Sequence, residues 1–235
     1  MNPMQHSLDR ARMVLGNDGL EKLARAHVLV VGLGGVGSYA AEALARSGVG
    51  KLTLVDHDTV DETNLNRQLC ALRSTIGQYK ADVMAGRLSQ LHEGLEIRAL
   101  RLFYHYDTRD EIFSDMPDYV LDCIDKVGAK IDLIETAQKN GIPILSALGT
   151  GKKLDPFKLK LCDIYDTRND GLARVMRKEL RKRGVASLRV VCSDEEAVLP
   201  ENEDSRTPGS LAWVPGCAGL MMAGICVREL AEGKN

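Results

Sequence analysis

Five polar side chains stand close together in the sequence, after an apolar segment that predicts a strand. They are Asp56, Asp58, Asn64, Arg67 and Lys80. A carboxylate at a strand end binds sugar hydroxyls, and two cations beside a nucleotide suit a reaction in which charge develops on its phosphates. A dehydrogenase needs the carboxylate and an apolar wall for its nicotinamide, but not this arginine and lysine. We therefore expect ATP to bind here as a reactant rather than as a redox carrier.

A glycine-rich turn precedes these side chains and offers a backbone that can approach a phosphate. Residues 28–31 predict a buried parallel strand and residues 38–46 a helix. The turn between them contains Gly32, Gly34, Gly35 and Gly37. Glycine permits the sharp turn, and the helix N-terminus supplies free N–H groups and positive dipole. Asp56 follows about twenty residues later, where a ribose hydroxyl would be met. The glycine pattern alone fits NAD, FAD and ATP proteins equally.

Strand and helix patterns alternate along the rest of the chain. This alternation predicts an α/β fold: a Rossmann-like, doubly wound, mostly parallel sheet with a C-terminal extension. We expect one domain with an N-terminal helical arm (1–25), a nucleotide-binding core (26–150) and a substrate-side extension (151–235) that contains a mobile loop (193–210). Within the extension we expect a strand at 157–161 and a basic amphipathic helix at 172–184.

The last apolar segment, residues 211–227, carries no charge. We expect a strand that turns at Pro215 and Gly216 into a buried helix. A membrane span is the lesser alternative, because the segment is at the lower length limit and is interrupted by proline and glycine.

Composition excludes several classes of protein. The 235 residues are 27% charged and 44% hydrophobic with a net charge of −2, which is typical of a soluble globular protein. The balance argues against a generally cationic nucleic-acid binder, although it leaves room for a local basic face. Aromatic residues make up 4%, too few for base-stacking platforms. The N-terminus lacks the apolar region of a signal peptide, so we expect a cytoplasmic protein.

Taken together, these motifs resemble the adenylation core of the ubiquitin-activating-like superfamily, which includes the molybdopterin-synthase and thiazole-biosynthesis (ThiF-type) adenylyltransferases. The resemblance is carried by the GxGGVG turn, Asp-x-Asp at 56–58, Asn-x-Asn-Arg-Gln at 64–68, Lys80 and Asp-Cys-Ile-Asp at 122–125. Members of this superfamily attach AMP to a carboxylate and release pyrophosphate. The resemblance therefore implies adenylation chemistry for residues from about 10 to 149.

The resemblance also implies roles for individual residues. Asp125 would hold Mg²⁺ on the phosphates, a role that suits a hard oxygen ligand. Arg10 would reach the ATP of the partner in a homodimer, with Arg12 as the alternative register. For Asp122 we expect a helix N-cap rather than a ligand. Lys126 departs from the family pattern, which usually has asparagine there.

The cysteines separate branches within the superfamily. Many members hold a structural zinc ion with two Cys-x-x-Cys pairs, whereas the six cysteines here, at 70, 123, 162, 192, 217 and 226, form no such pair. We expect no zinc and mostly buried free thiols. Within the superfamily, the chain is most similar to the tRNA threonylcarbamoyladenosine dehydratases. The similarity lies in the missing zinc cysteines, the basic segment 172–184 and the short C-terminal tail.

That branch activates the carboxylate of a modified adenosine beside the tRNA anticodon, and the acyl adenylate then closes a ring with loss of water. Whether the basic helix contacts tRNA stays open. The alternative is an enzyme that adenylates the C-terminus of a ubiquitin-like or sulfur-carrier protein, and a sulfur-transfer or carrier protein is a candidate partner. A third class is a dehydrogenase or a nucleotide-sensing module without chemistry.

Overall fold

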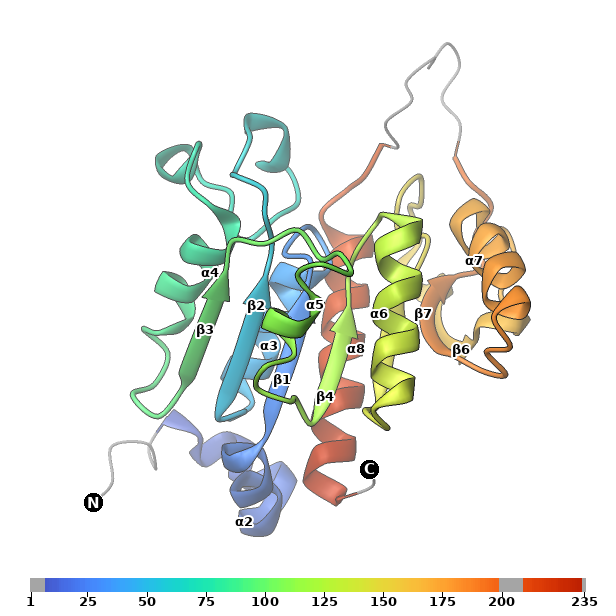
Figure 1. Ribbon diagram of the computed structural model, residues 1–235. Helices are drawn as coiled ribbons and strands as arrows, with labels where there is room; N and C mark the ends of the chain where they lie inside the picture. Colours follow the sequence, from blue (N-terminus) through green and yellow to red (C-terminus); the bar gives the residue numbers. More distant parts are fainter. Residues whose placement is uncertain (1–6, 199–208, 234–235) are drawn as a thin grey trace.

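The computed structural model, which describes residues 7–198 and 209–233, has a seven-stranded sheet at its centre (Figure 1). The strands are β1 (His27–Val31), β2 (Lys51–Val55), β3 (Glu96–Leu100), β4 (Tyr119–Asp122), β5 (Ile144–Ala147), β6 (Leu159–Asp163) and β7 (Arg189–Ser193). Their order is β3-β2-β1-β4-β5-β7-β6, and β6 is antiparallel to β7 while all other pairs are parallel. The predicted doubly wound, mostly parallel sheet is confirmed. The strand order reverses direction between β1 and β4, which is where ligands bind in such sheets.

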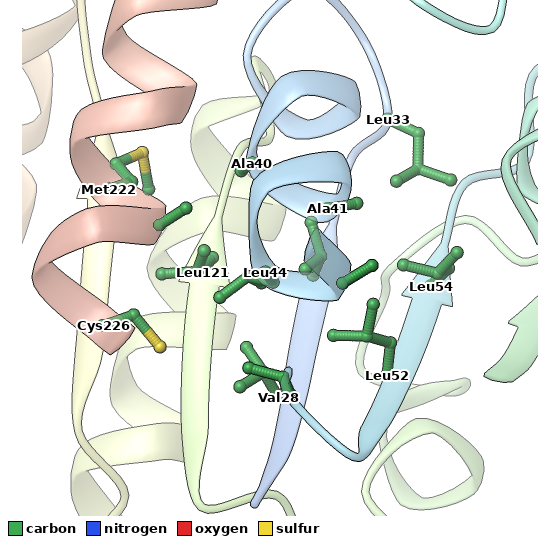
Figure 2. Packing of buried hydrophobic residues seen from close by; sticks show 14 of the residues in the cluster. Val28, Leu33, Ala40, Ala41, Leu44, Leu52, Leu54, Leu121, Met222 and Cys226 are labelled. Carbon is green, nitrogen blue, oxygen red and sulfur yellow. The ribbon is translucent and has the colours of Figure 1, made fainter. Parts of the chain in front are cut away.

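Helices cover both faces of the sheet. They are α2 (Asp9–Arg25), α3 (Gly37–Arg46), α4 (Lys80–Leu88), α5 (Arg109–Ile112), α6 (Val127–Lys139), α7 (Gly171–Lys182) and α8 (Trp213–Glu232). Successive strand residues face opposite sides, so Val28 and Val30 pack in the core under α3 and α8, and Leu29 and Val31 in the core under α6. Figure 2 shows the first of these cores, with Leu44 of α3 near Val28, Leu52 and Leu121.

The C-terminal segment differs from its prediction. There is no strand before Pro215: α8 begins at Trp213, and Pro215 lies in its first turn, where a missing N–H removes no intrahelical bond. Gly219 lets α8 approach α3 closely, since a Cβ there would lie 2.2 Å from the Val36 carbonyl oxygen. α8 is long and apolar enough to cross a membrane, but 56% of its apolar window is buried inside the protein, as in the core helix of a soluble protein.

Smaller differences concern element boundaries. The predicted helical arm is α2, which kinks at Gly16 (φ 73°). The strand expected at 157–161 is β6 and begins at Leu159, because Asp155 caps a short 3₁₀ turn that Pro156 starts. The predicted basic helix is α7, which buries Ala173, Met176 and Leu180. Of the loop expected at 193–210, Ser193 belongs to β7 and residues 199–208 lie outside the described residues, so its mobility stays a prediction.

Candidate active site

A cavity of about 790 Å³ opens at the carboxyl ends of the strands around the β1–β4 switch point. This volume is in the range of small-molecule sites, about 300–1,000 Å³. The predicted residues that line it are Gly32, Gly34, Gly35, Asp56, Asp58, Asn64, Arg67, Lys80 and Asp125. The structure therefore brings nine of the predicted residues together. Gly37 and Arg10 do not line the cavity.

The glycine turn is held by close backbone contacts. Gly32 has a φ of 90°, and a Cβ there would lie 2.7 Å from the carbonyl oxygen of Cys123. Gly37 begins α3 and packs on the same turn: its Cβ would lie 1.7 Å from the Gly32 carbonyl oxygen. Gly37 thus fixes the shape of the turn rather than facing the cavity. The turn ends at the N-terminus of α3, whose free N–H groups suit an anion.

Asp56 connects the end of β2 to the glycine turn. Its Oδ2 accepts the backbone N–H of Leu33 at 2.7 Å, and its Oδ1 accepts that of Asp58 at 2.8 Å. The side chain is 8% exposed and lies on the cavity wall. Its contact with a ribose stays a prediction.

Lys80 lies in the first turn of α4, as predicted, and is almost completely buried. Its Nζ donates to Asp58 at 2.8 Å, so a carboxylate offsets the unfavourable position of a lysine at a helix N-terminus. Burial alone would raise the pKa of Asp58, but the hydrogen bond and charge of Lys80 outweigh it and lower that pKa below 3.8. The pair places a cation with a fixed orientation on the cavity wall.

Asn64 is the last residue of the short helix η1 (Glu62–Asn64), and Arg67 lies in the turn that follows this helix. Arg67 donates to the carbonyl oxygen of Thr63 and to Asn66 Oδ1, both at 2.8 Å. Asn64 is buried, and its Oδ1 accepts the N–H of Asp61 at 3.1 Å. These bonds hold the arginine over the glycine turn, since its Cγ would lie 3.6 Å from a Cβ on Gly35.

Asp122 is not the helix N-cap that we expected. α6 begins later, with Lys126 at the N-cap, and Asp122 instead forms a completely buried ion pair with Lys130 at 2.8 Å. Ser146 donates to the same carboxylate at 2.6 Å, and Lys130 also donates to the Ile124 carbonyl oxygen at 3.1 Å. The pair joins β4, β5 and α6 beneath the loop that carries Asp125. Sequence reasoning missed Lys130, whose only signal was a charge within an apolar helical face.

Asp125 follows this loop and is exposed on the cavity wall. A free carboxylate here fits Mg²⁺, which binds proteins through one or two carboxylates and keeps its other positions for water and phosphate oxygens. Asp56, His57 and Asp58 also offer ligand atoms within 4.8 Å of one another, but Asp58 is paired with Lys80. The donor set therefore fits a metal held mainly by a nucleotide.

The cysteine nearest the site is structural. Burial raises the pKa of Cys123 to about 12 and that of Cys70 to about 11, so neither is a thiolate at neutral pH. Cys192 of β7 is completely buried, and burial raises its pKa to about 12. All six cysteines are free thiols in the structure, but only Cys70, Cys192 and Cys226 are buried, so the expectation of mostly buried thiols holds for half of them.

Arg10 lies on α2, which leads into the start of β1 at the end of the sheet opposite the cavity (Figure 1). It is exposed and cannot serve the site of its own chain. Arg12, the alternative, donates to Asp9 at 2.5 Å.

One wall of the cavity was not predicted. It comprises residues 149–153, after β5, and residues 169–172, which lead into α7, and we call it the β5–α7 wall. No local motif connects the two segments, which fold together only in three dimensions.

Known proteins resemble the chain along nearly all of its length. The model of the ThiF family matches residues 8–232. The tRNA threonylcarbamoyladenosine dehydratase of Bacillus subtilis is 41% identical over 244 residues, which cover 97% of this chain and 96% of that protein. The enzyme of that name from Escherichia coli is 38% identical over 196 residues, covering 80% of this chain and 73% of the relative.

The fold agrees with these relatives. A crystal structure of the E. coli tRNA N6-threonylcarbamoyladenosine dehydratase in complex with ATP has a TM-score of 0.92 and 32% identity, over 99% of this chain and 97% of that one. A structure of the same enzyme in complex with AMP has a TM-score of 0.93. From the matched motifs, the shared fold and the family model, we conclude that this chain belongs to the ThiF family.

Proposed function

We propose that this protein is an ATP-dependent tRNA threonylcarbamoyladenosine dehydratase. One observation carries the proposal: the strand-end cavity brings together the glycine turn, Asp56, Arg67, Lys80 and Asp125 in a chain that matches the dehydratase of B. subtilis over 96% of that protein's length. The enzyme would activate the carboxylate of the modified adenosine as an acyl adenylate. A nitrogen of the same group would then attack the acyl carbon and close the ring.

The residues suit each step of this reaction. Oxide is a poor leaving group, whereas AMP is a good one, so adenylation makes the carboxylate an electrophile. The carboxylate oxygen attacks the α-phosphorus and pyrophosphate leaves, with Arg67 and Lys80 placed to stabilise the departing charge. Ring closure then expels AMP with the former carboxylate oxygen, which accounts for the net loss of water. Because this second step is intramolecular, correct orientation supplies most of what it needs.

Mg²⁺ belongs to the proposal as a cofactor of the phosphates. Asp125 would hold it, and the ion would neutralise charge on the phosphates when bound. The protein's own part is to keep Asp125 in place through the loop that Asp122 and Lys130 support.

A homodimer would bring Arg10 of one protomer to the ATP of its partner. Mixing the Arg10→Ala and Arg67→Ala proteins tests this proposal, because a mixed dimer would contain one site with both arginines. We expect activity in the mixture that neither protein has alone. A mixture as inactive as its components would remove Arg10, and the same mixture with Arg12→Ala would then test the alternative register.

The function itself is tested by pyrophosphate release from ATP and Mg²⁺, with and without tRNA that carries threonylcarbamoyladenosine. We expect stimulation by this tRNA, loss of one water from the nucleoside by mass spectrometry, and neither effect in Arg67→Ala. Pyrophosphate exchange that ignores tRNA would favour the alternative, a carrier protein as substrate. No turnover of ATP in either assay would contradict both. We expect this reaction in the cytoplasm, where charged and modified tRNA is found.

A further inference from the structure

The β5–α7 wall contains an unusual concentration of left-handed backbone. Lys152 (φ 58°) and Asn169 (φ 53°) are the non-glycine residues with positive φ in the described part of the chain, and both line this wall. Asparagine adopts this conformation readily, whereas for lysine it is uncommon and the surroundings enforce it, as often happens at a ligand site. The segment that carries Lys152 is therefore shaped against its local preference.

Hydrogen bonds from distant segments enforce this shape. The backbone of Lys152 donates to the Gly209 carbonyl oxygen and accepts the N–H of Val198, each at 2.8 Å. Lys153 is 4% exposed, and its Nζ donates to the carbonyl oxygens of Asn169 and Glu195. Lys153 thus ties the two segments of the wall together. Lys152 also lines the cavity and forms no ion pair with any described residue.

Asp170 supplies the most informative group of the wall. Its Oδ1 caps α7 by accepting the N–H groups of Leu172 and Ala173 at 2.8 and 3.1 Å. Its Oδ2 is buried and has no hydrogen-bond partner among the described residues. Among the described residues that line the cavity, no other buried side-chain nitrogen or oxygen atom lacks a partner. Burying an acceptor without a donor is unfavourable. Capping needs one oxygen, which serine would also provide, so the helix does not explain the second.

Gly149 makes room for this second oxygen. A Cβ at Gly149 would lie 1.8 Å from Asp170 Oδ2, and the residue has a φ of 51°. The absence of a side chain and the left-handed backbone at Gly149 both serve to place the carboxylate where it is. Three features of one wall therefore converge on Asp170: strained backbone, a glycine fitted to the carboxylate, and an oxygen that lacks a donor.

We propose that the β5–α7 wall is the subsite for the carboxylate-bearing acceptor, and that the acceptor, on binding, uncovers Asp170 Oδ2 from Gly149 and donates a hydrogen bond to it from an N–H or O–H beside the reacting carboxylate. This inference rests on the proposed function, which needs an acceptor next to ATP in the same cavity. A threonylcarbamoyl group fits, because it carries ureido N–H groups and a hydroxyl close to its carboxylate. Lys152 supplies positive charge for that carboxylate. Asp170 is then a specificity-determining residue for the acceptor and not for ATP.

Asp170→Asn tests the proposal with little change in shape. Asparagine caps helices as well as aspartate does, and since its oxygen must face the N–H groups of α7, its amide nitrogen replaces Oδ2. The amide N–H group of the asparagine would then face the N–H or O–H group of the acceptor substrate, and two donors cannot form a hydrogen bond with each other. We expect kcat/KM for modified tRNA at saturating ATP to fall at least about tenfold, as for a site that loses a hydrogen bond to its substrate, while the Kd for ATP changes less than about twofold.

The control is Asp155→Asn, because Asp155 caps η3 (Pro156–Lys158) through the N–H of Phe157 at 2.9 Å and does not line the cavity. Asp155→Asn should leave both kcat/KM for modified tRNA and the Kd for ATP unchanged. Thermal unfolding shows whether each variant folds, and Asp170→Ser, which keeps the cap and removes Oδ2, decides the question if Asp170→Asn does not fold.

Two results would overturn the proposal. Wild-type kcat/KM for tRNA in the folded Asp170 variants would remove Asp170 from the acceptor subsite, and a parallel loss of ATP affinity would assign it to the nucleotide instead. A failure of the proposed function looks different: wild-type protein would then bind ATP, yet modified tRNA would elicit no pyrophosphate, and the subsite would fall with it.

Discussion

The two sides of the cavity are built in different ways. Apart from Asp125, the nucleotide side comes from one continuous stretch, residues 31–80. Its polar groups are bonded to one another: Asp56 to the N–H groups of Leu33 and Asp58, and Lys80 to Asp58. The β5–α7 wall comes from separate segments with left-handed backbone and an unpaired carboxylate oxygen. The first side is preorganised without a ligand, whereas the second leaves one bond for a ligand to make.

The largest loss of stability should come from breaking the ion pair between Asp122 and Lys130, which joins β4, β5 and α6. Lys130→Met would leave the carboxyl group of Asp122 completely buried without its partner, and removing one partner of such a pair costs about 3–5 kcal/mol of unfolding free energy. Urea denaturation measures this loss. Lys182→Met is the control, because its pair with Glu179 is exposed and should contribute at most about 1 kcal/mol. Equal losses in both variants would contradict the supporting role of the buried pair.

A glycine-to-alanine substitution on each side of the cavity should separate ATP binding from the use of tRNA. Gly37→Ala forces a Cβ against the Gly32 carbonyl oxygen, and Gly149→Ala forces one against Asp170 Oδ2. Each overpacking should cost about 1–3 kcal/mol of stability. Isothermal titration should show that Gly37→Ala weakens ATP binding at least about tenfold, as a lost close approach of backbone to phosphate implies. Gly149→Ala should instead lower kcat/KM for tRNA.

Gly86→Ala is the matched control for both, since nothing lies within 4 Å of a Cβ there and the residue is inside α4. We expect it to stabilise the protein by about 0.5–1 kcal/mol. Loss of ATP binding in Gly149→Ala as severe as in Gly37→Ala would erase the distinction between the two sides.

Arg67→Ala sharpens the role of the nucleotide side in the reaction. If Arg67 stabilises charge that develops as pyrophosphate leaves, kcat should fall by about 10²–10³-fold, the usual effect of losing one such donor. The KM for tRNA should stay close to that of the wild type. Single-turnover pyrophosphate release is the measurement. A raised KM for ATP with unchanged kcat would show that the arginine contributes only to binding.

The smallest effect concerns pH. Because Lys80 lowers the pKa of Asp58, this carboxyl group contributes stability that is present above pH 3.8 and is lost as the pH falls through its folded pKa. Lys80→Met should raise that pKa. The difference in unfolding free energy between the two proteins should therefore be present above pH 3.8 and shrink in stronger acid. If the unfolding free energies of the two proteins depended on pH in the same way in acid, Lys80 would not control the pKa of Asp58.

The same contrast explains what the sequence could predict. The glycine turn, Asp56, Asn64, Arg67 and Lys80 lie in one short stretch whose spacing alone implies a nucleotide site, and the alternation of strands and helices implies the sheet. The role proposed for Asp170 gave no such signal, because Gly149, which makes room for its second oxygen, lies more than twenty residues earlier in the chain. The Asp122–Lys130 pair was missed because it depends on which face of α6 is buried, and the start of α8 because Pro215 fits a helix N-terminus as well as a turn.

The central claim is that the nucleotide side activates a carboxylate that the β5–α7 wall presents. Oxygen-18 placed in the carboxylate of threonylcarbamoyladenosine in tRNA tests it most directly, with mass spectrometry of the nucleotide products after one turnover. Attack on the α-phosphorus followed by ring closure predicts AMP that carries one labelled oxygen and pyrophosphate that carries none. Label in inorganic phosphate, or in neither product, would contradict adenylation of the carboxylate.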